Sequence, residues 1–183
     1  MLYGIGNNDK TCPAKIKGKA LRQYVIWQSM LKRVAESRFY QDCYISDNFL
    51  NYSYFYNWAT NRKDFQNITW QLDKDLLVKG NKEYGETTCL FLPSELNLLL
   101  TTSKARRGDL PIGVCATRGK FQASLKKQGI NTFLGYYNDP IEAFYVYKEA
   151  KETHIKHMAS LYKDKLSDEA YYALLSYTVD LED

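Results

Sequence analysis

The segment 112–151 constrains the fold of this chain most strongly, because its apolar residues follow a strand period and then a helix period. Between residues 120 and 126, apolar side chains alternate with polar and cationic ones, in the order Lys120, Phe121, Gln122, Ala123, Ser124, Leu125 and Lys126. A period of two places the two kinds of side chain on opposite faces of a strand. Gly119 and Gly129 mark turns on either side, so we predict three short antiparallel strands. One face can pack on a helix, and the other suits an anionic ligand.

A helix start is well specified after the third strand. Asp139 can cap it, Pro140 suits the first helical position, and Glu142 completes a capping box. A face of small and large residues that can lie closely on the sheet follows: Ala143, Tyr147 and Ala150. We predict a last helix over residues 167–175, and alternation over residues 177–181 indicates an edge strand.

The first hundred residues favour helices with short strands. Apolar spacing predicts helices over residues 21–37 and 48–61, and the aromatic residues of the second are expected to form core. Residues 70–78 are expected to be extended, residues 89–92 to return as a strand, and residues 94–100 to form a helix. We therefore predict an α+β fold with a first unit over residues 1–100, a basic linker over residues 101–110, and a sheet-and-helix unit over residues 111–183.

Composition narrows the class of protein. The chain has 183 residues, is 45% hydrophobic and contains 16 Tyr, which indicates a folded protein rather than a disordered one. Its four cysteines are far apart and form no CxxC pair, so a zinc ribbon has no support. The N-terminus lacks the apolar region of a secretory signal, and no apolar run reaches the length of a membrane helix. We expect a cytoplasmic protein with free thiols and no membrane partner.

The charge distribution says more than the net charge of +4. Residues 101–135 contain seven basic residues and one acidic residue, a net charge of +6, whereas residues 136–183 carry ten acidic and five basic residues, a net charge of −5. Arg106, Arg107 and Arg118 contribute to the basic segment. Such a concentration is typical of a surface that binds phosphates. The alternative is a solvated basic loop that the acidic tail neutralises.

The segment 112–151 resembles the DNA-binding domain of plant APETALA and ethylene-response factors. The matching residues are Gly113-Val114, Gly119-Lys120-Phe121, Phe133-Leu134-Gly135-Tyr136, Glu142-Ala143, Tyr147 and Ala150. The resemblance implies a three-stranded sheet that lies in the major groove of double-stranded DNA, with a helix behind it. It also implies a DNA-facing set, namely Cys115, Arg118, Lys120, Gln122, Ser124, Lys126, Asn131 and Phe133. Cys115 and Asn131 stand where the plant family has arginines.

The chain as a whole resembles phage and prophage proteins that join an HNH homing-endonuclease-like unit to this kind of domain. The matching segments are residues 27–31, Trp58, residues 71–75, residues 80–84, residues 88–91, Asn97 and residues 111–114. The resemblance implies a small ββα element in the first unit. In a phage, the protein would act in the cytoplasm of the host cell.

The candidate nuclease centre lies at Asp73-Lys74-Asp75 and Asn81. HNH nucleases use a histidine as general base and a divalent metal at the leaving oxygen, and Lys74 stands at that histidine position. A lysine of ordinary pKa is protonated at neutral pH and is no base. Asp73 and Asp75 could instead hold Mg²⁺, which prefers oxygen ligands. The alternative is that both aspartates flank a turn and that Lys74 pairs with one of them.

Three hypotheses follow for the function. The first is a DNA-binding protein with a degenerate nuclease centre. The second is an active metal-dependent DNA endonuclease that uses Asp73 and Asp75. The third is an interaction protein in which the same scaffold engages a host or defence protein.

Overall fold

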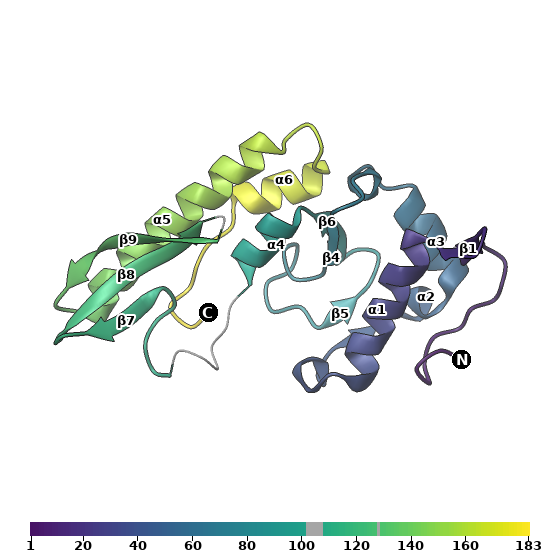
Figure 1. Cartoon of the computed structure of the whole chain (residues 1–183), viewed down its shortest axis with the longest axis horizontal. Coiled ribbons are helices and arrows are strands. Elements are labelled where there is room, and N and C mark those ends of the chain that lie inside the picture. Colours follow the sequence, from purple (N-terminus) through teal and green to yellow (C-terminus); the bar gives the residue numbers. More distant parts are fainter. Residues whose placement is uncertain (102–107, 128) are drawn as a thin grey trace. The chain divides into compact units, whose positions relative to one another are not determined.

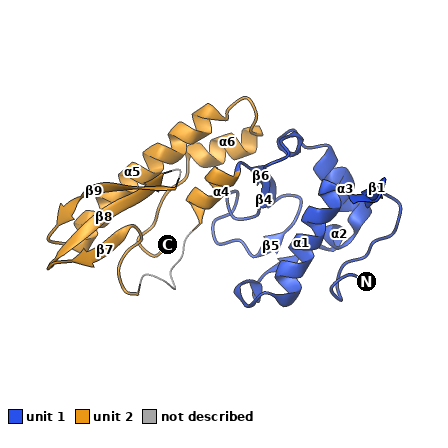
Figure 2. Cartoon of the chain, in the orientation of Figure 1, with its two compact units in different colours: residues 1–93 blue, residues 94–183 orange. Residues whose placement is uncertain are grey.

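The computed structural model describes residues 1–101, 108–127 and 129–183, which form an α+β fold with six α-helices and nine strands (Figure 1). The chain divides into two compact units, Met1–Pro93 and Ser94–Asp183, which Figure 2 colours separately. Helix α4 (Ser94–Leu100) forms where a helix was predicted and belongs to the second unit. Arg106 and Arg107 lie outside the described residues.

Helix α1 (Arg22–Glu36) of the first unit forms where the apolar spacing predicts it. Its buried residues Trp27, Met30 and Leu31 lie three and four positions apart, which places them on one face. The indole nitrogen of Trp27 donates a 2.8 Å hydrogen bond to the carbonyl oxygen of Phe49. This bond satisfies the one polar atom of a fully buried ring and ties α1 to the segment that follows.

The single helix expected over residues 48–61 is wrong, because the chain forms two helices, α2 (Asp47–Leu50) and α3 (Tyr52–Thr60). Asn51 between them has an extended backbone, and its side chain caps α3 by accepting a hydrogen bond from the N–H of Ser53. Asn7 bridges the break: its N–H donates to the carbonyl of Leu50 at 2.8 Å, and its carbonyl accepts from the N–H of Tyr52 at 3.0 Å. A contact with the N-terminal segment therefore replaces the helical bonds that periodicity favours.

Aromatic side chains form much of the core of the first unit, as predicted. Phe49, Tyr52 and Phe55 are fully buried, and the rings of Phe49 and Phe55 meet edge to face at 5.1 Å. Trp58 lies 4.7 Å from Phe49 in the same geometry. Edge-to-face contacts of this kind add to the stabilisation from burial alone.

Three small sheets and two 3-10 turns complete the first unit. The antiparallel pairs are β1 (Lys15–Ile16) with β2 (Lys19–Ala20) and β4 (Gln71–Asp73) with β6 (Leu90–Leu92), and the parallel pair is β3 (Tyr44–Ile45) with β5 (Glu83–Tyr84). The 3-10 turns are η1 (Arg38–Tyr40) and η2 (Asp64–Gln66). The extended segment expected over residues 70–78 is shorter than predicted, because the chain turns after Asp73. The strand expected at residues 89–92 is present as β6.

The expected HNH-like ββα element is not confirmed. Strands β4 and β6 pair in antiparallel fashion and α4 follows them in the chain, but α4 is part of the second unit. Strand β5, which lies between β4 and β6 in sequence, pairs with β3 instead.

The second unit contains the predicted three-stranded antiparallel sheet, in the order β7 (Val114–Thr117), β8 (Lys120–Lys127) and β9 (Ile130–Tyr137). Helix α5 (Pro140–Leu161) runs along one face of the sheet (Figure 1). The side chain of Asp139 caps α5 by accepting hydrogen bonds from the N–H groups of Ile141 and Glu142, at 3.3 and 3.4 Å. The sequence signals for the turns and for this cap are thus confirmed.

The core of the second unit lies between the sheet and α5. Its buried members are Ile112, Val114, Ala123, Leu125, Ala143, Phe144, Tyr147 and Val179. Gly113 allows β7 to approach α5, because a Cβ atom there would lie 2.1 Å from Cδ2 of Tyr147. Its φ of +79° also favours glycine.

The C-terminal segment packs against α5 by side-chain contacts. Helix α6 (Asp168–Leu175) begins after Ser167, as predicted. The edge strand expected over residues 177–181 is wrong, since none of these residues is in a strand. Instead, Val179 is buried, its carbonyl accepts a 2.5 Å hydrogen bond from Nζ of Lys148, and its N–H donates a 2.8 Å bond to Glu152. One turn of α5 therefore satisfies the backbone groups that a neighbouring strand would otherwise bind.

Candidate functional site

The sheet of the second unit presents a polar and cationic surface on the side away from α5. Residues paired directly across antiparallel strands share a face, and Gln122 pairs with both Cys115 and Tyr136. By the same register Ser124 faces outward with Phe133. We call this surface the outward face, which consists of Cys115, Thr117, Lys120, Gln122, Ser124, Lys126, Asn131, Phe133 and Tyr136.

The structure brings together on the outward face seven of the eight residues of the predicted DNA-facing set, all except Arg118. Lys120, Lys126 and Asn131 are exposed, whereas Gln122 and Ser124 are half-buried. The alternate residues Ala123 and Leu125 are buried against α5. The outward face contains no carboxylate, so its two ammonium groups are not neutralised from within it. Arg106 and Arg107 stay predictions, because they lie outside the described residues.

Arg118 occupies the tip of the β7–β8 hairpin. The two strands pair up to Thr117 and Lys120, which leaves Arg118 and Gly119 as a two-residue loop. Their φ values are +48° and +76°, as a type I′ turn requires. Glycine adopts this conformation freely, but an arginine in the left-handed region is uncommon. Arg118 is exposed, so it adds a cation at the tip of the hairpin, next to Lys120.

Tyr136 belongs to the outward face although alternation along the sequence does not place it there. Ser124 pairs with Phe133 while Ala123 pairs with Gly135, so Leu134 is an extra residue that forms a β-bulge. Strict alternation from Phe133 would turn Tyr136 toward α5. The bulge turns Tyr136 outward and lets Leu134 and Tyr137 pack on the core. The sequence signal for this bulge is Gly135, since a glycine inside a strand pattern often marks a bulge.

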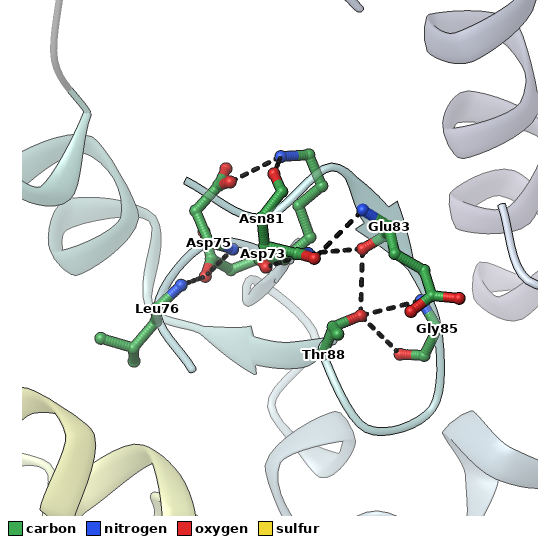
Figure 3. Close-up of polar contacts among 8 residues, drawn as sticks. Asp73, Asp75, Leu76, Asn81, Glu83, Gly85 and Thr88 are labelled. Atoms are coloured by element: carbon green, nitrogen blue, oxygen red, sulfur yellow. Dashed lines mark hydrogen bonds and ion pairs between the residues drawn. The ribbon is translucent and has the colours of Figure 1, made fainter. Parts of the chain in front are cut away.

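The Asp73 side chain organises a tight turn in the first unit (Figure 3). One carboxylate oxygen accepts hydrogen bonds from the N–H groups of Asp75 and Leu76, at 3.1 and 2.8 Å. Such bonds from an aspartate to the backbone that follows it are typical of turns. Burial raises the pKa of the Asp73 carboxyl above its ordinary value, although both backbone bonds favour the charged form.

Lys74 is nearly buried, with 6% of its surface exposed, and its ammonium group is fully engaged. Nζ lies 2.5 Å from Oδ1 of Asp75 and 2.7 Å from the carbonyl oxygen of Asn81, and it faces the ring of Tyr84 at 5.8 Å. Lysine thus pairs with one of the two flanking aspartates, as the turn interpretation predicts. In this arrangement Lys74 is a donor that holds the loop together.

Asn81 and Thr88 close the same loop (Figure 3). The amide nitrogen of Asn81 donates to the carbonyls of Lys74 and Glu83, and its amide oxygen accepts from the N–H of Glu83. The hydroxyl of Thr88 donates to the Glu83 carbonyl and accepts from the N–H of Gly85. All four predicted catalytic residues therefore take part in one network that fixes the chain between β4 and β6.

The carboxylates of Asp73 and Asp75 each have partners within the turn. One oxygen of Asp73 is committed to two backbone amides, and the Asp75 carboxylate is committed to the Lys74 ammonium. A divalent cation at Asp75 would lie beside that ammonium group and be repelled by it. Across residues 1–101, 108–127 and 129–183 there is also no cluster of three His, Cys, Asp or Glu side chains suited to a metal.

Comparison with known proteins gave no match, whether to a protein-family model, to a curated protein or to a solved structure. In the part of the chain that the structure describes, none of the helices combines the length and the apolar character needed to span a membrane.

Proposed function

We propose that the second unit binds DNA through the outward face of its sheet. The observation that carries the proposal is the contrast between the two faces of β8: Ala123 and Leu125 are buried against α5, whereas Lys120 and Lys126 are exposed on the other side. Exposed lysines on a face with no carboxylate suit a row of phosphates.

The surrounding groups suit DNA as well. Gln122 and Asn131 carry amides that can donate to and accept from base edges. Ser124 is short enough to let a ligand approach the backbone. Arg118 extends from the hairpin tip and retains a conformation that is costly for arginine, and such costs concentrate at functional positions.

The first experiment is an anisotropy titration of the full-length protein with a labelled DNA duplex, the ligand that the family resemblance implies. Exchanging Lys120 and Lys126 for Glu should weaken binding by at least about tenfold, since each removes a phosphate contact and adds repulsion. The matched control is Lys156→Glu with Lys165→Glu, which changes the net charge equally. Both control lysines are exposed and lie outside the sheet. Equal losses in the two double variants would contradict the proposal.

Two further assays test the alternative functions. A supercoiled plasmid incubated with Mg²⁺ or Mn²⁺ reports on an endonuclease, which would nick the plasmid and would lose that activity in Asp73→Ala or Asp75→Ala. A protein partner that binds the Lys120→Glu, Lys126→Glu variant as tightly as the wild type would instead favour the interaction hypothesis.

A further inference from the structure

Two aromatic rings stand side by side on the outward face. Phe133 is 55% exposed and Tyr136 is 56% exposed, and their ring centroids lie 4.9 Å apart with planes inclined by 57°. Their partners across the ladder are Ser124 and Gln122, of which neither is apolar. Both rings thus present large apolar surfaces to solvent, at a place where the sheet is also cationic.

The β-bulge is the reason that the rings meet. Phe133 and Tyr136 are three residues apart, and residues three apart on a regular strand point to opposite faces. The extra residue Leu134 brings both onto the outward face. With Leu134 present in this strand, the two rings share a face because the strand forms a bulge there.

The two aromatic rings suit unpaired DNA better than a duplex. In a duplex, the flat faces of the bases are stacked on each other and only their edges reach the grooves. Unpaired bases expose their faces, and aromatic side chains on a sheet bind those faces by stacking. Lysines beside the rings can hold the phosphates that connect successive bases. Lys126 and Lys120 lie on this same face, in the register positions that flank Ser124 and Gln122.

We propose that Phe133 and Tyr136 stack on unpaired bases, so that the second unit binds single-stranded DNA in preference to a fully paired duplex. This inference rests on the proposed function, because it assigns the preferred form of DNA to the same outward face. The inclined rings offer two stacking platforms, and the charged residues around them supply affinity that is independent of sequence.

The test uses the full-length protein and three labelled probes of one sequence: a single strand, the paired duplex, and the duplex with a short unpaired gap. We expect the single strand and the gapped duplex to bind about tenfold more tightly than the paired duplex. In the Phe133→Ser, Tyr136→Ser variant, affinity for the single strand should fall by at least about tenfold, a typical loss for stacking residues, and affinity for the paired duplex should fall by less.

The matched control is Phe39→Ser with Tyr145→Ser. These two aromatic residues are 78% and 61% exposed but lie outside the sheet, so single-strand affinity should be unchanged. A single strand that carries 2-aminopurine gives a direct readout, because stacking on an aromatic ring quenches its fluorescence. Quenching by the wild type should disappear in the Phe133→Ser, Tyr136→Ser variant even at protein concentrations that saturate the probe.

The outcomes separate this inference from the proposed function. Tighter binding of the paired duplex, or an equal loss for all probes in the aromatic variant, would overturn the stacking inference, and the lysine variants would still decide DNA binding. If no DNA probe binds, both proposals fail. If RNA of the same sequence binds more tightly than the DNA strand, the assignment to DNA is overturned.

Discussion

Arg118 is the residue at which stability and the proposed function oppose each other. Its left-handed φ of +48° suits Asn or Gly better than Arg. We expect Arg118→Asn to stabilise the hairpin by about 1 kcal/mol, because the unfavourable conformation is relieved. The same variant should weaken DNA binding several-fold. Hydrogen exchange of the β7 and β8 amides measures the first effect, and the anisotropy titration measures the second.

The control for the loss of charge is Lys165→Asn, which removes one cation outside the sheet. It should leave both hydrogen exchange in β7 and DNA affinity unchanged. If the β7 and β8 amides exchange faster in Arg118→Asn than in the wild type, the arginine conformation does not destabilise this turn.

Asp73 allows the turn interpretation to be tested through pH. Because the folded pKa lies above the ordinary value of 3.8, protonation of Asp73 favours folding. That contribution is present below 3.8 and is lost as the pH rises through the folded pKa. Asp73→Asn keeps the side-chain oxygen that accepts the two backbone bonds and removes the buried charge. We therefore expect Asp73→Asn to be at least as stable as the wild type at pH 7, with the difference shrinking as the pH approaches 3.8.

Asp73→Ala is the companion variant, since it removes the acceptor and leaves the N–H of buried Leu76 without its partner. It should cost about 1–3 kcal/mol. Urea unfolding followed by tryptophan fluorescence is the measurement, because Trp27, Trp58 and Trp70 all lie in the first unit. A large loss of stability in Asp73→Asn at neutral pH would show that the charge itself is needed.

At the scale of elements, the approach of β7 to α5 depends on Gly113. Gly113→Ala introduces a Cβ atom into the Tyr147 ring and places alanine at a φ of +79°. Conformational strain alone costs about 1–3 kcal/mol, and the clash adds to it. Gly119→Ala, at a φ of +76° with open space around it, is the matched control for strain. Thermal unfolding followed by circular dichroism should show a larger loss for Gly113→Ala, and equal losses would contradict the packing argument.

Elements with strong local signals could be predicted from the sequence. Helix α1 follows apolar spacing, the hairpins follow Gly119 and Gly129, and α5 follows the Asp139 cap. Elements set by distant contacts could not. The break at Asn51 depends on Asn7, and the C-terminal segment is held by side chains of α5 rather than by a strand.

The candidate sites likewise contain residues that local sequence patterns predict and residues that they do not. Regular alternation along β8 predicts that Lys120, Gln122, Ser124 and Lys126 share a face. Tyr136 could not be placed by alternation, since a bulged residue shifts the sequence alternation of every residue after it by one position. The network around Asp73, Lys74 and Asn81 depends on a loop whose course no periodicity encodes.

At the scale of the whole molecule, segregation of charge predicts how binding responds to salt. Arg118, Lys120 and Lys126 are the cations that the described hairpin and outward face offer. If each contacts one phosphate of a duplex, the slope of log affinity against log salt should be about −2.7, or a loss of roughly 40-fold between 50 and 200 mM salt.

The measurement is the anisotropy titration repeated over that range. The Lys120→Glu, Lys126→Glu variant should show a slope shallower by about 1.8. An affinity that does not change with salt concentration would contradict phosphate binding. A much steeper slope would mean that cations beyond these three contribute.

The bulge at Leu134 also affects how this chain should be aligned with others. A strand that absorbs an added residue as a bulge keeps the facing of its other side chains, so strand length and surface chemistry can change separately. A homologue that lacks this one residue would still present both aromatic rings on the same side. The correct alignment of such a homologue places a single gap at Leu134, and a gap-free alignment would pair Tyr136 with a residue that faces the core.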